Sequence, residues 1–251
     1  MGDTHTTDGD ESGRPTTATG DESGRPGAEG RTPPPGSHGA RAALYGAVGA
    51  VLAGPDAETL ADLRAGEVRA SLREAGERLG LAAETAAFCE AVATADGQGA
   101  MRAYDEVFGL PTDDGTYPVV PYEAHYTTGE EGGEAQRRIA TVVGLMEAFD
   151  VEPAATFHER QDHAAGELEL AAVVAAKRAV AREADASAGA TEHLRDAEAT
   201  LLDRHLADFV PAFAHDVRTA TDDPLLLATA DLAGELVRRD AAGSLEVRDD
   251  A

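Results

Sequence analysis

Residues 157–163 read FHERQDH, and this stretch holds the side chains best suited to chemistry. His158 and His163 flank two acids, an arginine and a glutamine, immediately before a long helix-forming segment. Imidazole and carboxylate groups ligate metal ions, and a histidine beside an acid can transfer protons. The same residue types also cap and connect helices. The stretch therefore supports three hypotheses: a metal site, acid–base chemistry, or a structural hinge.

The spacing of the two histidines argues against a helical zinc site. An HExxH site needs histidines four residues apart, so that both rings project from one face of the helix. His158 and His163 are five residues apart, and at about 100° per residue their side chains diverge by roughly 140°. His163 and Glu167 do share a face, and His158 could join them from a loop. These three residues define our alternative prediction, a metal-dependent all-helical hydrolase, although no second shell is evident for it.

Other catalytic signatures are missing from the sequence. There is no Gly-x-Ser-x-Gly motif, and the glycines of GEEGG have neither the lysine nor the preceding strand of a phosphate-binding loop. Cys89 is the single cysteine, which excludes an internal disulfide and a cysteine-based zinc site. Its apolar neighbours at helical spacing predict a small buried side chain. We therefore predict that the protein is not an enzyme and carries no metal or cofactor.

The structural hypothesis assigns Asp162 as the N-cap of the following helix. Its carboxylate can accept hydrogen bonds from the first-turn amides, and His163 is then a partly exposed residue of the first turn. Glu167, near the N-terminal end, suits the helix dipole. Under this hypothesis Arg160 pairs with Glu159 or Glu167.

Apolar residues recur every three or four positions from His38 onward, which predicts helices. Aromatic residues make up 4% of the chain, and alternation typical of strands occurs nowhere at length. We therefore predict an all-α fold of eight or nine helices, with Pro211 and Pro224 in first-turn positions. The predicted helices lie within ARAALYGAVGAVLAG, TLADLRAGEVRASLREAGERLG, ETAAFCEAVATA, QGAMRAYDEVFGL, EAQRRIATVVGLMEAFDV, residues 162–182, TEHLRDAEATLLDRHLADFV, PAFAHDVRTATDD and PLLLATADLAGELVRRD.

Two kinds of non-helical segment interrupt this pattern. Residues 1–37 are polar, contain GDESGRP twice, and are predicted to form a disordered tail; residues 242–251 are predicted to be frayed. Between the helices, the loop PTDDGTYPVVPYEAHYTTGEEGG holds three of the five tyrosines. Of these, Tyr117 and Tyr126 are predicted to be packing residues. Aromatic residues concentrated in a loop often serve binding.

The formal net charge is −26, of which residues 1–37 contribute −4, so the remainder carries −22. Such a surface repels nucleic acid and anionic membranes, which we exclude as partners, and it suits a cationic peptide. Lys177 is the single lysine, and acid excess with scarce lysine is typical of a salt-adapted protein.

We find no apolar run as long as a membrane span and no export signal, and we predict a cytoplasmic protein.

Three stretches carry a resemblance to a known family. ERQDHAAGELEL resembles the E-R-x-D-H motif and acidic-apolar helix of the TorD/DmsD family, the chaperones dedicated to molybdenum-cofactor oxidoreductases, with the NarJ-type nitrate reductase chaperones as relatives. YDEVFGLP followed by VVPYEAHY, and LLDRHLADFVPAFAHDV, resemble further motifs in the same order. The resemblance covers about Met101 to Val217. Departures from its pattern are Ala124 for serine, Val119-Val120 before Pro121, and Phe209 for tryptophan.

The resemblance implies a TorD-like helical bundle with an N-terminal helical domain at residues 38–150, a hinge at 151–161 and a smaller C-terminal helical domain at 162–241. It also implies a chaperone that binds the twin-arginine signal peptide or N-terminus of a molybdopterin-containing oxidoreductase catalytic subunit, similar to DMSO, TMAO or nitrate reductase. Such a chaperone holds its client until cofactor insertion and export. As a member of this family it would be a monomer or a domain-swapped dimer.

Seven residues match the signal-peptide site of that family. Carboxylates at two of these positions can pair with arginine in a bidentate manner, and the aromatic rings can stack on guanidinium. We hypothesise that FHERQDH and PYEAHY form two walls of one groove. The matching residues are Val107, Phe108, Pro121, Tyr122, Glu123, Asp162 and His163.

Overall fold

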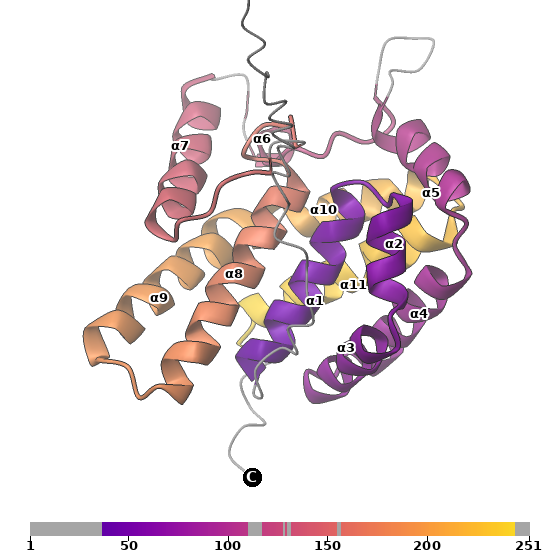
Figure 1. Ribbon diagram of the computed structural model, residues 1–251. Helices are drawn as coiled ribbons and strands as arrows, with labels where there is room; N and C mark the ends of the chain where they lie inside the picture. Colours follow the sequence, from indigo (N-terminus) through magenta and orange to yellow (C-terminus); the bar gives the residue numbers. More distant parts are fainter. Residues whose placement is uncertain (1–36, 110–116, 128, 130–131, 155–156, 244–251) are drawn as a thin grey trace, which may run out of the picture. The chain divides into compact units, whose positions relative to one another are not determined.

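Helices make up the regular structure of the chain, as the spacing of its apolar residues predicts. The computed structural model describes residues 37–109, 117–127, 129, 132–154 and 157–243 (Figure 1). No strand forms within these ranges, which confirms the all-α prediction. The elements are α1 (Ser37–Leu52), α2 (Ala57–Arg64), α3 (Gly66–Arg78), α4 (Ala82–Thr94), α5 (Gly97–Tyr104), α6 (Glu123–Thr127), α7 (Gly132–Ala148), α8 (Ala164–Glu183), α9 (Ala188–Leu201), α10 (Ala207–Ala220), α11 (Pro224–Ala241), and the π-helical turns η1 (Asp105–Gly109) and η2 (Leu202–Leu206).

The helix ends show where local sequence signals act and where they fail. Asp223 caps α11 by accepting from the amides of Leu225 and Leu226, and Pro224 occupies the first turn as predicted. The prediction for Pro211 is wrong, because this proline lies inside α10. The chain passes from α9 through η2 into α10 without leaving helical geometry. There is consequently no new first turn for Pro211 to occupy.

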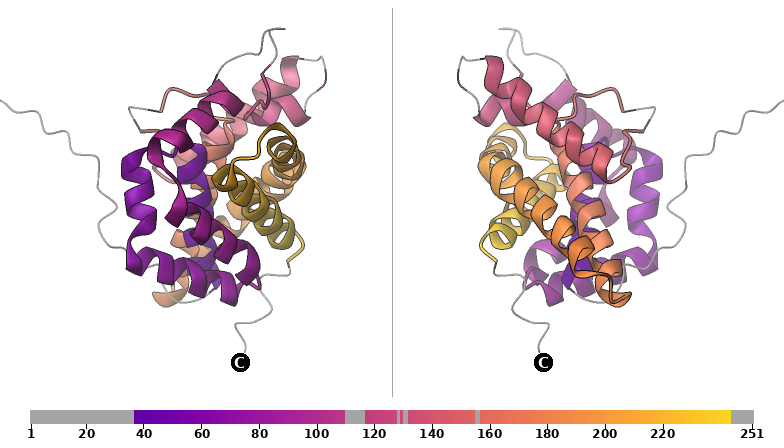
Figure 2. Two further views of the ribbon diagram at one scale, coloured as in Figure 1. Left: turned by 90° about the vertical axis from the view of Figure 1, so that its right-hand side faces the viewer. Right: turned by 90° about the vertical axis from the view of Figure 1, so that its left-hand side faces the viewer.

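Small residues allow α1 to lie directly against α8, the central pairing of the fold (Figure 1). A Cβ atom at Gly49 would come within 3.0 Å of the Glu169 side chain and 3.4 Å of the Ala165 carbonyl oxygen. The glycines and alanines of α1 thus let the two helix backbones approach closely. Figure 2 shows α8 and α9 on one side of the bundle and the helices from the first part of the chain on the other.

A buried arginine ties α1 to the end of the chain. Arg41 is 2% exposed, and its Nε and Nη2 atoms lie 2.9 and 2.8 Å from Asp240 of α11. Nη2 also lies 2.9 Å from Glu198 of α9, and the hydroxyl of Tyr45 donates to Asp240 at 2.8 Å. Three helices that are distant in sequence therefore meet on one guanidinium group.

All described residues belong to one compact unit that spans Thr32–Ala251. Its apolar core contains residues from both sides of the predicted hinge. Leu44 and Phe88 precede the hinge in the sequence, and Leu168 and Phe213 follow it. The division into two helical domains remains a prediction. Within the described ranges, no helix combines the length and apolar character needed to cross a bilayer. The single cysteine, Cys89, is buried, as predicted.

Parts of four predicted segments lie outside the described residues. These parts are the polar tail up to residue 36, with both GDESGRP repeats, residues 111–116, 128, 130 and 131 of the tyrosine-containing loop, residues 155 and 156 of the predicted hinge, and residues 244–251, which were predicted to be frayed.

Candidate functional site

Two irregular segments, residues 119–123 and 157–163, lie side by side at the N-terminus of α8. Tyr122 and His163 form an isolated antiparallel bridge. On one side of it the amide of Glu123 donates to the carbonyl of Asp162 at 2.8 Å, and on the other the amide of Ala164 donates to the carbonyl of Pro121 at 2.8 Å. The fold therefore brings together residues from the two sequence motifs that are 39 to 43 positions apart in the chain.

The helix α8 begins differently from the prediction. His163, not Asp162, is its N-cap, with φ −77° and ψ 137°, and its Nδ1 atom accepts from the amide of Ala165 at 3.1 Å. Nor is His163 partly exposed, since 2% of it is accessible. Asp162 is turned the other way, toward α6: its carboxylate accepts from the amide of Ala124 at 3.3 Å. The residue that was predicted to cap α8 instead contributes to the N-terminus of α6.

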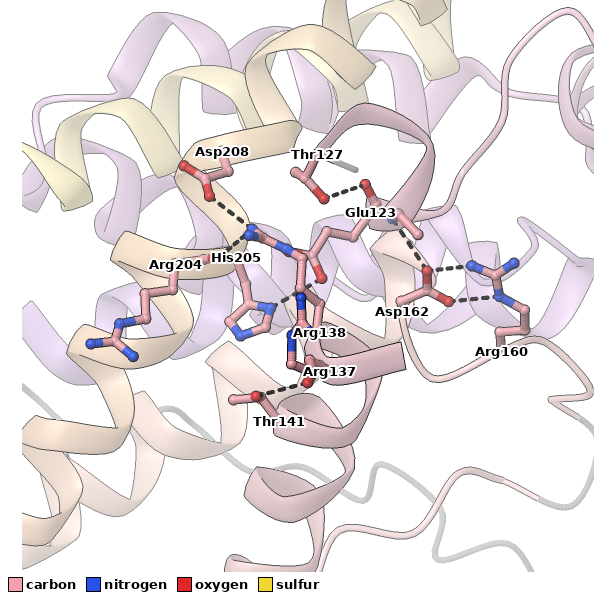
Figure 3. A network of polar contacts seen from close by, with 11 residues as sticks. Glu123, Thr127, Arg137, Arg138, Thr141, Arg160, Asp162, Arg204, His205 and Asp208 are labelled. Atoms are coloured by element: carbon pink, nitrogen blue, oxygen red, sulfur yellow. Dashed lines mark hydrogen bonds and ion pairs between the residues drawn. The ribbon is translucent and has the colours of Figure 1, made fainter. Parts of the chain in front are cut away.

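Arg160 binds the buried carboxylate of Asp162. Its Nε and Nη2 atoms lie 2.8 and 2.5 Å from the two Asp162 oxygens (Figure 3). The predicted pairing of Arg160 with Glu159 or Glu167 is therefore wrong, because Asp162 is nearer and requires a counter-ion inside the protein. The guanidinium also lies 4.5 Å from the centre of the Tyr122 ring, and the Tyr122 hydroxyl donates to Glu159.

Glu123 points into the protein and joins three helices. One oxygen accepts from Nε of Arg138 in α7 at 2.7 Å, and the other lies 3.0 Å from Nδ1 of His205 in η2. Arg138 extends further to Asp208 at 2.7 Å and to the carbonyl of Arg204 (Figure 3). The carboxylate of Glu123 is 0% exposed and already has two partners. It positions α6 and α7 and does not face solvent.

Glu123, Glu167 and His205 form a group that could hold a metal ion, with ligand atoms within 4.8 Å of one another. Neither oxygen of Glu167 has a hydrogen-bond partner among the described residues. Burial, and next the charge of Glu123, raise the pKa of Glu167 well above its ordinary value of 4.5. Burial beside the Glu123 carboxylate thus favours the protonated form of Glu167, and Arg138 pairs with Glu123.

This arrangement corrects the alternative metal prediction. His158 is exposed and His163 uses Nδ1 to cap α8, so neither joins Glu167 in the group that the described residues form. Arg138 and His205 were not assigned a role from the sequence. His205 stands inside the LLDRHLADF motif, which is the signal that could have identified it, whereas nothing local marks Arg138.

Of the remaining predicted site residues, Phe108 belongs to an aromatic layer over the core. The ring of Phe108 lies 5.0 Å from that of Tyr104 and 6.0 Å from that of Phe213, centre to centre. Val107 is buried, and its carbonyl accepts from the amide of Val119 at 3.2 Å. This backbone contact links the middle of η1 to the segment that leads to Tyr122.

The two tyrosines that were predicted to pack behave differently. Tyr126 packs near Phe209 and Phe213, and its hydroxyl donates to Asp216 at 3.1 Å. Tyr117 is 52% exposed, so the prediction is wrong for this residue. The sequence signal was the same, but only Tyr126 lies on a helix that contacts α10.

Burial lowers the pKa of His163 from 6.5 to about 4. The neutral ring is also the form that can accept from Ala165. Since the folded-state pKa lies below the unfolded one, stability falls as the pH drops from 6.5 toward 4.

We expect His163→Asn to flatten this pH dependence, because asparagine caps helices without titrating. Between pH 7 and pH 5.5 the wild type should lose about 1 kcal/mol more than the variant, measured by urea unfolding at constant salt. The comparison concerns the slope, because the loss of packing against Tyr122 and Phe157 lowers the stability of the variant at every pH. Parallel curves for the two proteins would contradict the prediction.

The family described as nitrate reductase delta subunit matches residues 67–215, which include α3 to most of α10 and both segments of the site. The chain belongs to this family. Its members are maturation factors rather than catalytic enzymes, and their partners are molybdoenzyme subunits such as nitrate reductase. No curated protein matches the chain.

Proposed function

We propose that this protein is a cytoplasmic chaperone of the TorD/DmsD kind. It binds the twin-arginine signal peptide or N-terminal segment of a molybdopterin oxidoreductase catalytic subunit, similar to DMSO, TMAO or nitrate reductase. It holds this client until the cofactor is inserted and export can begin. Its acid excess and single lysine support a salt-adapted protein. A two-domain organisation around residues 151–161, and a monomeric or domain-swapped state, belong to the same proposal.

The observation that carries the proposal is the guanidinium site between the two segments. A fully buried carboxylate, Asp162, and the ring of Tyr122 converge on one arginine side chain that is 52% exposed. A carboxylate that presents both oxygens to a guanidinium, together with an aromatic face, is the combination that recognises arginine. Because the net charge is −26, a cationic segment also meets no long-range repulsion.

The seven predicted peptide-binding residues divide into two roles. Tyr122 and Asp162 contact the guanidinium, and Phe108 is half-buried in the aromatic layer with Tyr104 and Phe213. The other four, Val107, Pro121, Glu123 and His163, are buried and hold the two segments in place. We therefore propose peptide contact at the first group and positioning by the second.

Calorimetric titration of the full chain with a synthetic twin-arginine peptide that carries an apolar segment tests this function. We expect Tyr122→Leu to weaken binding roughly 5- to 30-fold, because the ring face that covers the guanidinium is lost. Tyr117→Leu removes an exposed tyrosine of the same loop and is the matched control. A twin-lysine peptide should bind more weakly than the twin-arginine peptide, since an ammonium group cannot pair with both carboxylate oxygens. Equal affinity of wild type and Tyr122→Leu would contradict the proposal.

A further inference from the structure

Arg160 occupies the site that the proposed function assigns to an arginine of the client. Its guanidinium makes two parallel contacts with Asp162, at 2.8 and 2.5 Å, and lies 4.5 Å from the centre of the Tyr122 ring. The carboxylate is 0% exposed, so its contacts form in a region from which water is largely excluded. Charge-assisted pairs of this geometry are among the strong polar contacts in proteins.

The position of Arg160 makes its side chain exchangeable. It is 52% exposed, whereas its partner is buried, and it lies outside the helices, four residues before α8 begins. Arg160 and Asp162 are only two residues apart, so releasing this contact separates no helices. The backbone bonds that join the two segments involve Pro121, Glu123, Asp162 and Ala164 and do not use the Arg160 side chain.

We propose that Arg160 is an intramolecular competitor for a guanidinium site formed by Asp162 and Tyr122. An incoming peptide arginine displaces Arg160 and takes over the same two carboxylate contacts and the same ring face. The inference rests on the proposed function. Because one guanidinium replaces another, few polar contacts are lost. The apparent affinity of the peptide equals its intrinsic affinity multiplied by the fraction of molecules in which Arg160 has left the site.

Removing the competitor should therefore tighten peptide binding. We expect Arg160→Ala to bind the twin-arginine peptide roughly tenfold more tightly than wild type in the same calorimetric titration. Arg160→Lys keeps a cation beside Asp162 and so preserves the fold, but it cannot pair with both oxygens at once, and its affinity should fall between the two. Unchanged or weaker binding by both variants overturns the competitor role.

A small cation tests the site without any peptide. In Arg160→Ala, millimolar methylguanidinium chloride should raise the midpoint of thermal unfolding more than methylammonium chloride at equal concentration, because only the former fits both Asp162 oxygens. Arg218→Ala is the matched control: Arg218 also pairs with an aspartate, at 3.0 Å, but that Asp231 is 56% exposed. A methylguanidinium effect of equal size in both variants, or none in Arg160→Ala, overturns the site.

The two experiments separate this inference from the proposed function. Selective stabilisation of Arg160→Ala by methylguanidinium, with no peptide binding by any variant, supports the guanidinium site and contradicts the peptide function. Equal peptide affinity in wild type, Arg160→Ala and Arg160→Lys supports the function and contradicts the competitor.

Discussion

Replacing Arg41 by methionine is expected to lower the free energy of unfolding by about 3–5 kcal/mol, because the change removes a buried cation that pairs with both Asp240 and Glu198. Arg41 is 2% exposed and pairs with Asp240 and Glu198, whose side chains are 3% and 11% exposed. Methionine fills a similar volume, so the loss reports charge and not a cavity. Urea unfolding at constant salt measures it.

The matched control for this substitution is Arg218→Met in α10. Arg218 and Asp231 are 40% and 56% exposed, and a surface pair of this kind contributes about 0–1 kcal/mol. The double variant Arg41→Met/Asp240→Asn should recover part of the stability lost by Arg41→Met, since it also removes the buried negative charge that faced Arg41. A loss for Arg41→Met no larger than that of the surface control would contradict the role of Arg41 in joining α1, α9 and α11.

The second large effect concerns Glu167. Burial, with the charge of Glu123, raises the pKa of its carboxyl well above 4.5 in the folded state. Below pH 4.5 Glu167 is protonated in both the folded and the unfolded chain, so its full contribution to stability is present. As the pH rises above 4.5, the unfolded chain releases the proton while the folded chain retains it, and stability is lost by up to about 1.4 kcal/mol per pH unit.

Glutamine has the shape of the protonated carboxyl and does not titrate. We therefore expect the stability of Glu167→Gln relative to wild type to increase as the pH rises from 5.5 to 7.5, measured from urea midpoints at each pH. Glu134→Gln, at an exposed position in α7, controls for the general effect of removing a negative charge. The contribution of Glu167 to the free energy of unfolding falls as the pH rises, whereas that of His163 falls as the pH drops. The Glu167 and His163 variants are therefore each compared with wild type separately.

Two results would contradict a protonated Glu167. One is a stability difference between Glu167→Gln and wild type that does not change with pH. The other is stabilisation of wild type, but not of the variant, by added zinc or manganese, which would show that the group of Glu123, Glu167 and His205 holds a cation.

The sequence by itself determined the helical architecture and the pairing of motifs. Apolar periodicity depends on residues within one or two turns, which is why the helices and the Asp223–Pro224 start of α11 follow from it. The motif resemblance further predicted that Tyr122 and Asp162 act together, and the Tyr122–His163 bridge brings those segments into contact. Both kinds of signal are carried by the order and type of neighbouring residues.

Only the tertiary structure decided which atoms each polar side chain meets. Asp162 was expected to cap the helix next to it, yet its carboxylate faces the amide of Ala124, 38 residues away, and His163 caps α8 instead. Arg138 and His205 reach Glu123 from α7 and η2 for the same reason. A buried carboxylate takes the donor that packing brings closest, because leaving it unpaired away from water costs more than any local preference supplies. The sequence of FHERQDH therefore shows which reactive side chains are present. The packing of α6, α7 and α8 determines which of these side chains remain accessible to a partner.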